Sequence, residues 1–224
     1  MIGLIALGVS LVAGPFLYIH VVQGQAPAPL SLASPSSGAG SGTADTTSTK
    51  GTSGTWKVAA GSLAGYRVRE VLFGQRNVAV GRTSQISGSM TVDGSTISEA
   101  TFMVNMTSIT SNESRRDEQF NGRIMETATY PTATFTLTKA IGFASVPKPG
   151  TERTFQVTGT LTLHGVSRTV TFAATGRFTG SAVQLVGSVP IRFADYGISN
   201  PSFGPVTTED HGVLEFSLKL THGE

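Results

Sequence analysis

The stretch FQVTGTLTLHGVSRTVTFAAT, residues 155–175, carries the pattern that decides the fold. Apolar side chains alternate with polar ones in both halves of it, at Phe155, Val157, Leu161, Leu163, Val170, Phe172 and Ala174. The pair His164-Gly165 separates the two halves. Period-two alternation on both sides of a glycine predicts a β-hairpin with one apolar face. Such a hairpin is not stable alone, so we expect further strands to cover that face.

The same alternation recurs on both sides of this hairpin. It predicts strands within residues 56–72, 78–92, 96–109, 132–138, 182–193 and 213–220. The pattern breaks at residues 111–131, where charged residues gather and Ser111 or Asn112 is expected to cap a short helix. An all-β fold of about eight strands with one short helical insertion follows. Closing eight antiparallel strands into an up-and-down barrel removes free edges, although periodicity fits a two-sheet sandwich equally well.

Composition excludes several classes of function. Charged residues make up 13% of the chain and the net charge is +2, without a basic cluster, so no nucleic-acid partner is expected. The absence of cysteine excludes disulfides and thiol chemistry. The four histidines, His20, His164, His211 and His222, lack metal-ligand spacing, and no nucleophile elbow, dinucleotide or Walker A motif is present. We therefore predict no enzyme activity, no metal and no catalytic cofactor.

The N-terminal stretch predicts attachment to a membrane. Residues 2–22 contain no formally charged side chain and are long enough to cross a bilayer as a helix. A cleaved signal peptide is the alternative. No basic residue precedes the apolar run, and the small-residue site ending at Ala26 is followed by Pro27, so a retained anchor over residues 1–24 is favoured. The first Lys or Arg is Lys50, so charge says little about orientation, and we expect the C-terminal domain outside the cytoplasm from the composition of the linker and the domain.

A linker is expected between this anchor and the barrel. Residues 25–54 are rich in Ala, Pro, Ser, Gly and Thr, and their only charges are Asp45 and Lys50. This composition predicts a flexible tether with a root-mean-square span of about 30 Å. The globular domain then occupies residues 55–224.

Five segments in order carry a resemblance to a known family. They are Ser108-Ile109, Arg116-Asp117, YPTATF at 130–135, GTLTLHGV at 159–166 and FADYG at 193–197. Over residues 55–220 the chain resembles the YceI-like polyisoprenoid-binding family. The resemblance implies a lipocalin-like antiparallel barrel that holds an isoprenoid or acyl-like chain, without catalysis. Family members often carry His-Ser where this chain has Ala64-Gly65, and a His where it has Glu118-Gln119.

The expected ligand-binding wall consists of inward-facing apolar residues. They are Tyr66, Val68, Phe102, Val104, Met106, Phe135, Leu137, Val157, Leu161, Leu163, Val170, Phe172, Leu185, Val189, Phe216 and Leu218. A filled core is the alternative from the residues alone, whereas the resemblance implies a ligand tunnel. Arg115 and Arg116 are expected to meet a polar head group at the mouth. Alternatively, Arg116 or Asp117 pins the helical segment to the sheet.

Two functional hypotheses follow. The first is a membrane-tethered, extracytoplasmic binding protein for isoprenoid or similar long-chain lipids of the quinone or polyprenyl type, whose only bound group is the lipid. The second is an accessory subunit of a larger membrane complex, with the barrel as a docking scaffold. Small residues at Gly3, Gly8 and Gly14 suit close helix packing in such a complex.

Overall fold

The computed structural model describes residues 26–32 and 52–223. The predicted anchor over residues 1–24 and most of the predicted linker lie outside these ranges. Within the described residues no helix combines the length and the apolar character needed to span a bilayer. The first described part of the linker, residues 26–32, lies against the barrel, with Arg67 donating a hydrogen bond to the carbonyl of Pro27.

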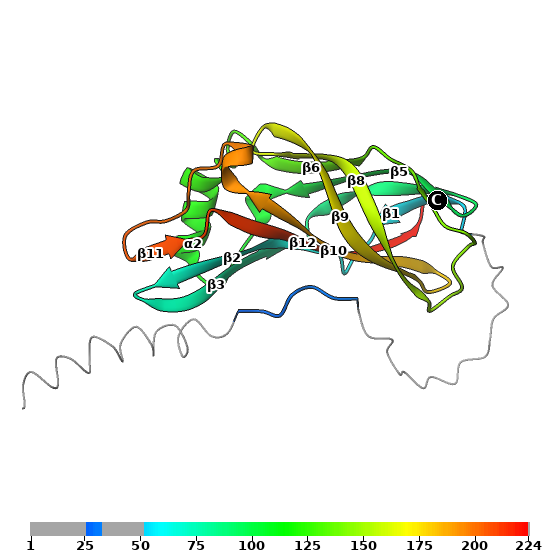
Figure 1. Ribbon diagram of the computed structural model, residues 1–224, viewed down its shortest axis with the longest axis horizontal. Helices are drawn as coiled ribbons and strands as arrows, with labels where there is room; N and C mark the ends of the chain where they lie inside the picture. The colour runs from blue at the N-terminus through cyan, green and yellow to red at the C-terminus, as the bar shows by residue number, and fades with distance from the viewer. Residues whose placement is uncertain (1–25, 33–51, 224) are drawn as a thin grey trace, which may run out of the picture.

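One antiparallel sheet of twelve strands makes up the domain (Figure 1). The strands are β1 Gly54–Val58, β2 Leu63–Leu72, β3 Gln75–Thr83, β4 Ile86–Asp93, β5 Thr96–Asn105, β6 Thr132–Leu137, β7 Ile141–Gly142, β8 Glu152–Leu163, β9 Val166–Phe178, β10 Ala182–Arg192, β11 Val206–Thr208 and β12 His211–His222. The helical segments are η2 Met106–Ser108, α2 Ser114–Gln119, η3 Phe120–Ile124 and η4 Phe193–Tyr196. All-β architecture with a short helical insertion is thereby confirmed.

The sheet closes on itself as an eight-stranded barrel. Both β1 and β2 pair with β12, at residues 220–222 and 213–217, so they lie one after the other along the same strand. β3 and β4 share the next position in the same way, because β2 pairs with β3 and β1 with β4. The remaining positions are β5, β6, β8, β9, β10 and β12. Neighbouring positions follow one another in sequence, which confirms the up-and-down barrel over the sandwich.

The hairpin predicted at residues 155–175 is formed by β8 and β9. Leu163 pairs with Val166, which leaves His164 and Gly165 as a two-residue turn with φ of 50° and 73°. Two positive φ values are typical of the type I′ turn that matches the twist of a hairpin. Leu163 is fully buried, and the apolar face of the hairpin lies in the barrel interior.

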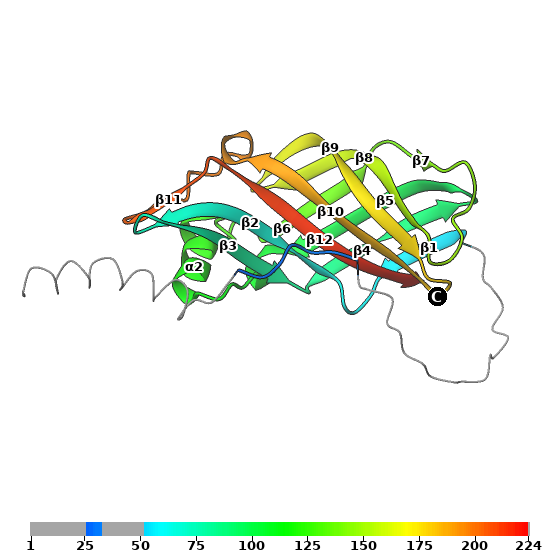
Figure 2. The same cartoon turned by 60° about the horizontal axis from the view of Figure 1, so that its bottom comes forward.

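The helical insertion covers one end of the barrel (Figure 2). The predicted cap was wrong: the helix begins at Ser114, and the side chain of Glu113 accepts the hydrogen bond from the Arg115 amide. Ser111 instead donates its hydroxyl to Asp117 at 2.6 Å. Behind the helix, the Phe120 ring stacks on Tyr66 with centroids 5.1 Å apart. This stacking holds the insertion against β2 at that end of the barrel.

Candidate functional site

An elongated cavity of about 910 Å³ occupies the barrel interior. Its mouth lies between the helical insertion and the loops around β11, where Arg115, Phe73 and Phe203 line it. At the opposite end Trp56 packs edge-on against Phe178, with centroids 5.9 Å apart. The barrel is therefore hollow with a mouth at the α2 end, and Trp56 and Phe178 pack in the buried cluster near β1 beyond the cavity lining.

The structure brings the predicted wall together. Each predicted residue lines the cavity except Val170, which is half-buried and packs against the same apolar cluster without reaching the lumen. Sequence reasoning missed several apolar lining residues, among them Ile109, Phe120, Ile191 and Phe193. Phe120 and Phe193 lie in helical segments and Ile109 directly follows one, where strand alternation gives no face. Ile191 alternates with Val189 on the inward face of β10, as the pattern expected, but was left out of the predicted wall. Ligand contact by the wall residues stays a prediction.

Close contacts between aromatic rings and glycines help to keep this barrel hollow. Tyr66 pairs across strands with Gly81, and Phe216 pairs with Gly187. A Cβ atom at Gly81 would lie 2.4 Å from the Tyr66 ring, and one at Gly187 would lie 2.6 Å from the Phe216 ring. Each ring thus rests on bare backbone along the wall. Because these rings lie flat against the wall, they do not project into the barrel interior, and that volume remains part of the cavity.

Phenylalanine rings contact each other edge to face across the apolar wall. The ring of Phe172 lies 5.6 Å from that of Phe135 and 5.9 Å from that of Phe216, at interplanar angles of 69° and 77°. Edge-to-face contacts stabilise a ring pair beyond the area that the rings bury. They hold this part of the wall in a defined shape before any ligand arrives.

A buried ion pair lies at the mouth of the cavity. Glu70 continues the inward face that begins with Tyr66 and Val68, and it is 9% exposed. Its Oε1 accepts hydrogen bonds from Arg116 Nη2 at 3.2 Å and from Asn77 Nδ2 at 2.7 Å. The sequence-based reading missed Glu70, although the alternation of β2 points it inward. An acid on this face requires a partner, because an unpaired buried charge is costly.

The two predicted arginines have different surroundings. Arg116 connects α2 to β2 through Glu70 and donates to Asn112 Oδ1 at 2.8 Å, as the pin interpretation expected. Arg115 is exposed on the same helix, and both arginines line the mouth. Arg115 is therefore the predicted residue with room to meet a polar group of a bound molecule.

Tyr66 supplies a neutral polar group close to the mouth. Burial raises the pKa of its phenol well above the usual range, and the opposing effect of the Arg116 charge is smaller. A phenol is already protonated at physiological pH, and the raised pKa extends this neutral form to more alkaline pH, so the hydroxyl is available as a hydrogen-bond donor. A neutral donor beside an apolar wall suits a carbonyl or hydroxyl head group.

Residues that carry the family resemblance largely join loops to the barrel. His164 Nδ1 lies 3.1 Å from the carbonyl oxygen of Tyr196, and the Tyr130 ring packs against His164 at 4.5 Å. Ser108 shares a 2.6 Å hydrogen bond with Thr83. These contacts fix the loops at the α2 end of the barrel and thereby define the shape of the mouth.

Comparison with known proteins agrees with this architecture. The YceI-like domain family matches residues 56–220. UPF0312 proteins from Vibrio parahaemolyticus and Vibrio vulnificus are 31% and 30% identical over 127 residues, which cover 53% of this chain. The match spans 64% of the length of these curated relatives.

Two solved structures share the fold at low sequence identity. A polyisoprenoid binding domain from Saccharophagus degradans has a TM-score of 0.60 and 18% identity, covering 76% of this chain and 99% of that domain. BcnA from Burkholderia cenocepacia has a TM-score of 0.54 and 22% identity, covering 72% and 98%. At these identities the similarity establishes the fold.

Proposed function

The chain belongs to the YceI-like domain family, and on this premise we propose that its barrel binds an isoprenoid or similar long-chain lipid without catalysing a reaction. The observation that carries the proposal is the apolar cavity of about 910 Å³. Small-molecule sites usually enclose about 300–1,000 Å³, so this cavity is at the large end of that range. The polyisoprenoid binding domain from Saccharophagus degradans, which shares the fold, supports the same class of ligand.

Hydrophobic transfer would drive this binding, and its size sets a minimum chain length. Each buried methylene contributes about 0.8 kcal/mol, whereas association costs about 4–15 kcal/mol in lost freedom. A single five-carbon unit would gain about 4 kcal/mol on this scale and would not bind measurably. Several consecutive units are needed, and affinity should rise with chain length until the cavity is full.

The mouth supports binding of a lipid with an oxygen-containing head. Arg115 and the neutral Tyr66 hydroxyl offer donors there, while Glu70 already accepts from Arg116. Guanidinium groups suit phosphate oxygens and phenols suit carbonyls. Quinone and polyprenyl lipids both present an apolar tail with such a head, and both remain within the proposal.

Two adjacent alanines on β9 provide a matched test. Ala174 is 4% exposed and lines the cavity, whereas Ala173 faces outward on the same strand. Ala174→Phe is expected to fill part of the lumen and to weaken binding of a fluorescent quinone analogue at least about tenfold, which corresponds to about 1.4 kcal/mol. Ala173→Phe should bind like the wild type. Equal binding by both variants, with circular dichroism unchanged, would refute the cavity as the binding site.

We further propose that the barrel is tethered to a membrane through residues 2–22 and lies outside the cytoplasm. The uncharged composition of that stretch supports the tether, and the low charge of the linker supports export. Extraction of membranes with alkaline carbonate followed by immunoblotting tests the tether. Release of the full-length chain into the soluble fraction would contradict it, whatever the outcome of the lipid-binding test.

A further inference from the structure

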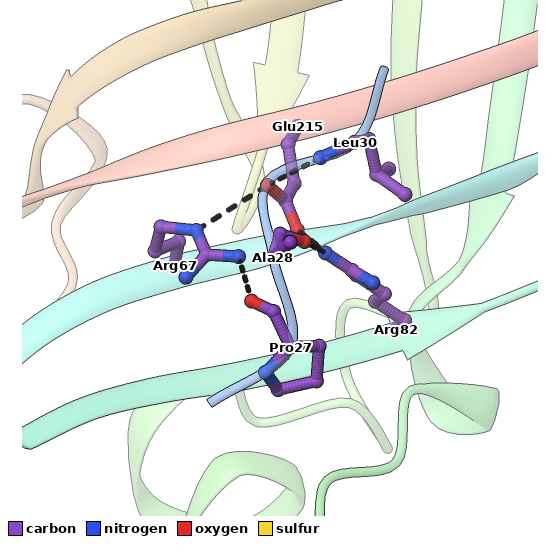
Figure 3. Close-up of polar contacts among 6 residues, drawn as sticks. All are labelled: Pro27, Ala28, Leu30, Arg67, Arg82 and Glu215. Carbon is purple, nitrogen blue, oxygen red and sulfur yellow. Dashed lines mark hydrogen bonds and ion pairs between the residues drawn. The ribbon is translucent and has the colours of Figure 1, made fainter. Parts of the chain in front are cut away.

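Residues 26–32, here called the strap, run along the outside of the barrel over β12, β2 and β3 (Figures 2 and 3). The carbonyl of Pro27 accepts a hydrogen bond from Arg67 Nη2 at 2.6 Å, and the carbonyl of Ala28 accepts one from Arg82 Nη2 at 2.5 Å. The amide of Leu30 donates to Glu215 Oε2 at 3.4 Å. The strap is thus bound through its backbone at three successive points.

The barrel side of this contact is built around a buried carboxylate. Glu215 is only 5% exposed although it lies on the outer face of β12. It pairs with Arg82 at 2.7 Å and with Arg67 at 3.4 Å. Two cations share one anion, so guanidinium N–H groups are left over for the strap carbonyls. Arg67 and Arg82 are only partly exposed, and the strap carbonyls accept hydrogen bonds from the Nη2 atoms of both.

A glycine makes this arrangement possible. Glu215, Gly65 and Arg82 occupy one row across three neighbouring strands. A Cβ atom at Gly65 would lie 2.9 Å from Arg82 Cγ. The bare backbone of Gly65 therefore lets the Arg82 side chain cross β2 and reach Glu215, which assembles the pocket for the strap.

The strap also has a direction. Pro27 contacts Arg67, whereas Leu30 contacts Glu215, which pairs with Gly65. β2 runs from Gly65 through Arg67 towards the mouth, so Pro27 lies nearer the mouth than Leu30 does and the N-terminal end of the strap faces it. The apolar run ends at Val22, and the four peptide steps from there to Ala26 span at most about 14 Å.

The rim of the mouth exposes aromatic side chains at that same end. Phe73 is 54% exposed and Phe203 is 66% exposed. Their loops are joined, because the Phe73 amide donates to the carbonyl of Pro205 at 3.3 Å. Phe73 has φ of 49° in a two-residue turn with Gly74, a conformation that disfavours a bulky residue. An aromatic ring that is both strained and exposed indicates a role other than folding.

Cationic side chains lie beside these rings. The Arg123 guanidinium lies 5.6 Å from the Phe203 ring centroid, and Arg115 and Arg76 are exposed at the same end, with Glu118 as an exposed acid. Aromatic rings and arginines together are typical of surfaces at the membrane interface. The rim therefore has the chemistry of a lipid contact.

We propose that the rim docks on the surface of the lipid bilayer, with the strap holding the mouth towards it, so that a ligand passes between bilayer and cavity without crossing water. This inference rests on the proposed membrane tether. Attachment of the strap to the barrel would shorten the effective tether to the few residues between Val22 and Ala26. A free linker of residues 25–54 would instead let the barrel turn in any direction.

The absence of cysteine allows a direct test with single labels. Thr207→Cys places a nitrobenzoxadiazole label on exposed β11 at the rim, and Ser181→Cys places it in the exposed β9–β10 turn at the far end. The full-length protein is reconstituted into phosphatidylcholine vesicles that contain lipids with a nitroxide head group or a nitroxide acyl chain. We expect quenching at Thr207→Cys and none at Ser181→Cys. Equal quenching would overturn the docking and leave lipid binding by the cavity untouched.

Two insertions of identical sequence test the strap. A Gly/Ser segment of about 20 residues adds a span of about 25 Å, inserted either between Gln25 and Ala26 or between Ser41 and Gly42. Because the strap lies between these sites, only the first insertion should abolish quenching at Thr207→Cys. The same effect from both insertions would overturn the role of the strap. Recovery of the labelled protein outside the vesicles would overturn the tether, and the inference with it.

Discussion

Arg116 reaches Glu70 at the mouth of the cavity, with Nη2 3.2 Å from Oε1, across 46 positions of the sequence. Both side chains are largely buried, at 15% and 7% exposure. The pair joins α2, which borders the mouth, to β2 in the barrel wall. The position of the helical insertion thus depends on this ion pair and on the stacking of Phe120 on Tyr66.

Arg116→Met should destabilise the protein by about 2 kcal/mol, because it leaves the Glu70 charge buried without its cation. The double variant Glu70→Met/Arg116→Met should regain much of that loss, since neither charge remains. Thermal unfolding followed by circular dichroism in detergent measures both. Equal stability of Arg116→Met and the wild type would show that the pair does not hold the helix.

Arg82→Gln should cost about 2 kcal/mol for the same reason, because Glu215 is buried. It should also free the strap, which amide hydrogen exchange at Leu30 would report as faster exchange. Arg69→Gln is the matched control on β2: its pair with Glu209 is 4.0 Å long and exposed, so its loss should change stability by less than about 0.5 kcal/mol. Slow exchange at Leu30 in Arg82→Gln would count against the strap.

The raised pKa of Tyr66 predicts that the free energy of unfolding falls as the pH becomes alkaline. Its pKa is raised in the folded protein by burial, so the phenol favours folding below the unfolded pKa of about 10. As pH rises above that value the unfolded chain ionises first, and the contribution is lost at up to about 1.4 kcal/mol per pH unit.

Tyr66→Phe lacks this group and serves as the reference. The unfolding free energy of the wild type should fall relative to Tyr66→Phe between pH 9 and pH 11. Tyr196, whose pKa is also raised by burial, is present in both proteins and cancels in the comparison. A difference that stays constant over this range would contradict a raised pKa at Tyr66.

Phe73→Asn should stabilise the barrel by about 1 kcal/mol, because Asn tolerates the positive φ at this turn position. The same substitution should weaken the contact of the rim with lipid. Phe203→Asn, at a residue without a positive φ, should weaken lipid contact without the gain in stability. Urea unfolding and quenching of the Thr207→Cys label measure the two effects separately. Loss of stability in Phe73→Asn would show that the ring packs in the fold.

Alternation along the strands made most of the fold predictable from sequence. Gly159 and Leu161 lie where the 155–175 pattern placed them, on the inner face of β8. Alternation also predicted the cavity wall, because in a hollow barrel the residues that point inward along each strand are the residues that line the cavity. Val170 is the exception, since it has the inward parity of Phe172 but does not reach the lumen.

The remaining features depend on contacts between distant parts of the chain. That Gly65 would let Arg82 reach Glu215 was not predictable from sequence, because this requires the register of three strands. Composition alone predicted a flexible tether at residues 26–32, whereas three backbone groups there bind the barrel. The hollow interior likewise depends on rings that rest on glycines of the partner strand.

Native mass spectrometry of the full-length protein, released in detergent from the membranes that contain it, tests lipid binding by the cavity most directly. We expect a bound mass that matches a polyisoprenoid or a quinone, present in the wild type and reduced in Ala174→Phe but not in Ala173→Phe. A protein that carries no lipid and co-migrates with other subunits would contradict it and favour the docking scaffold.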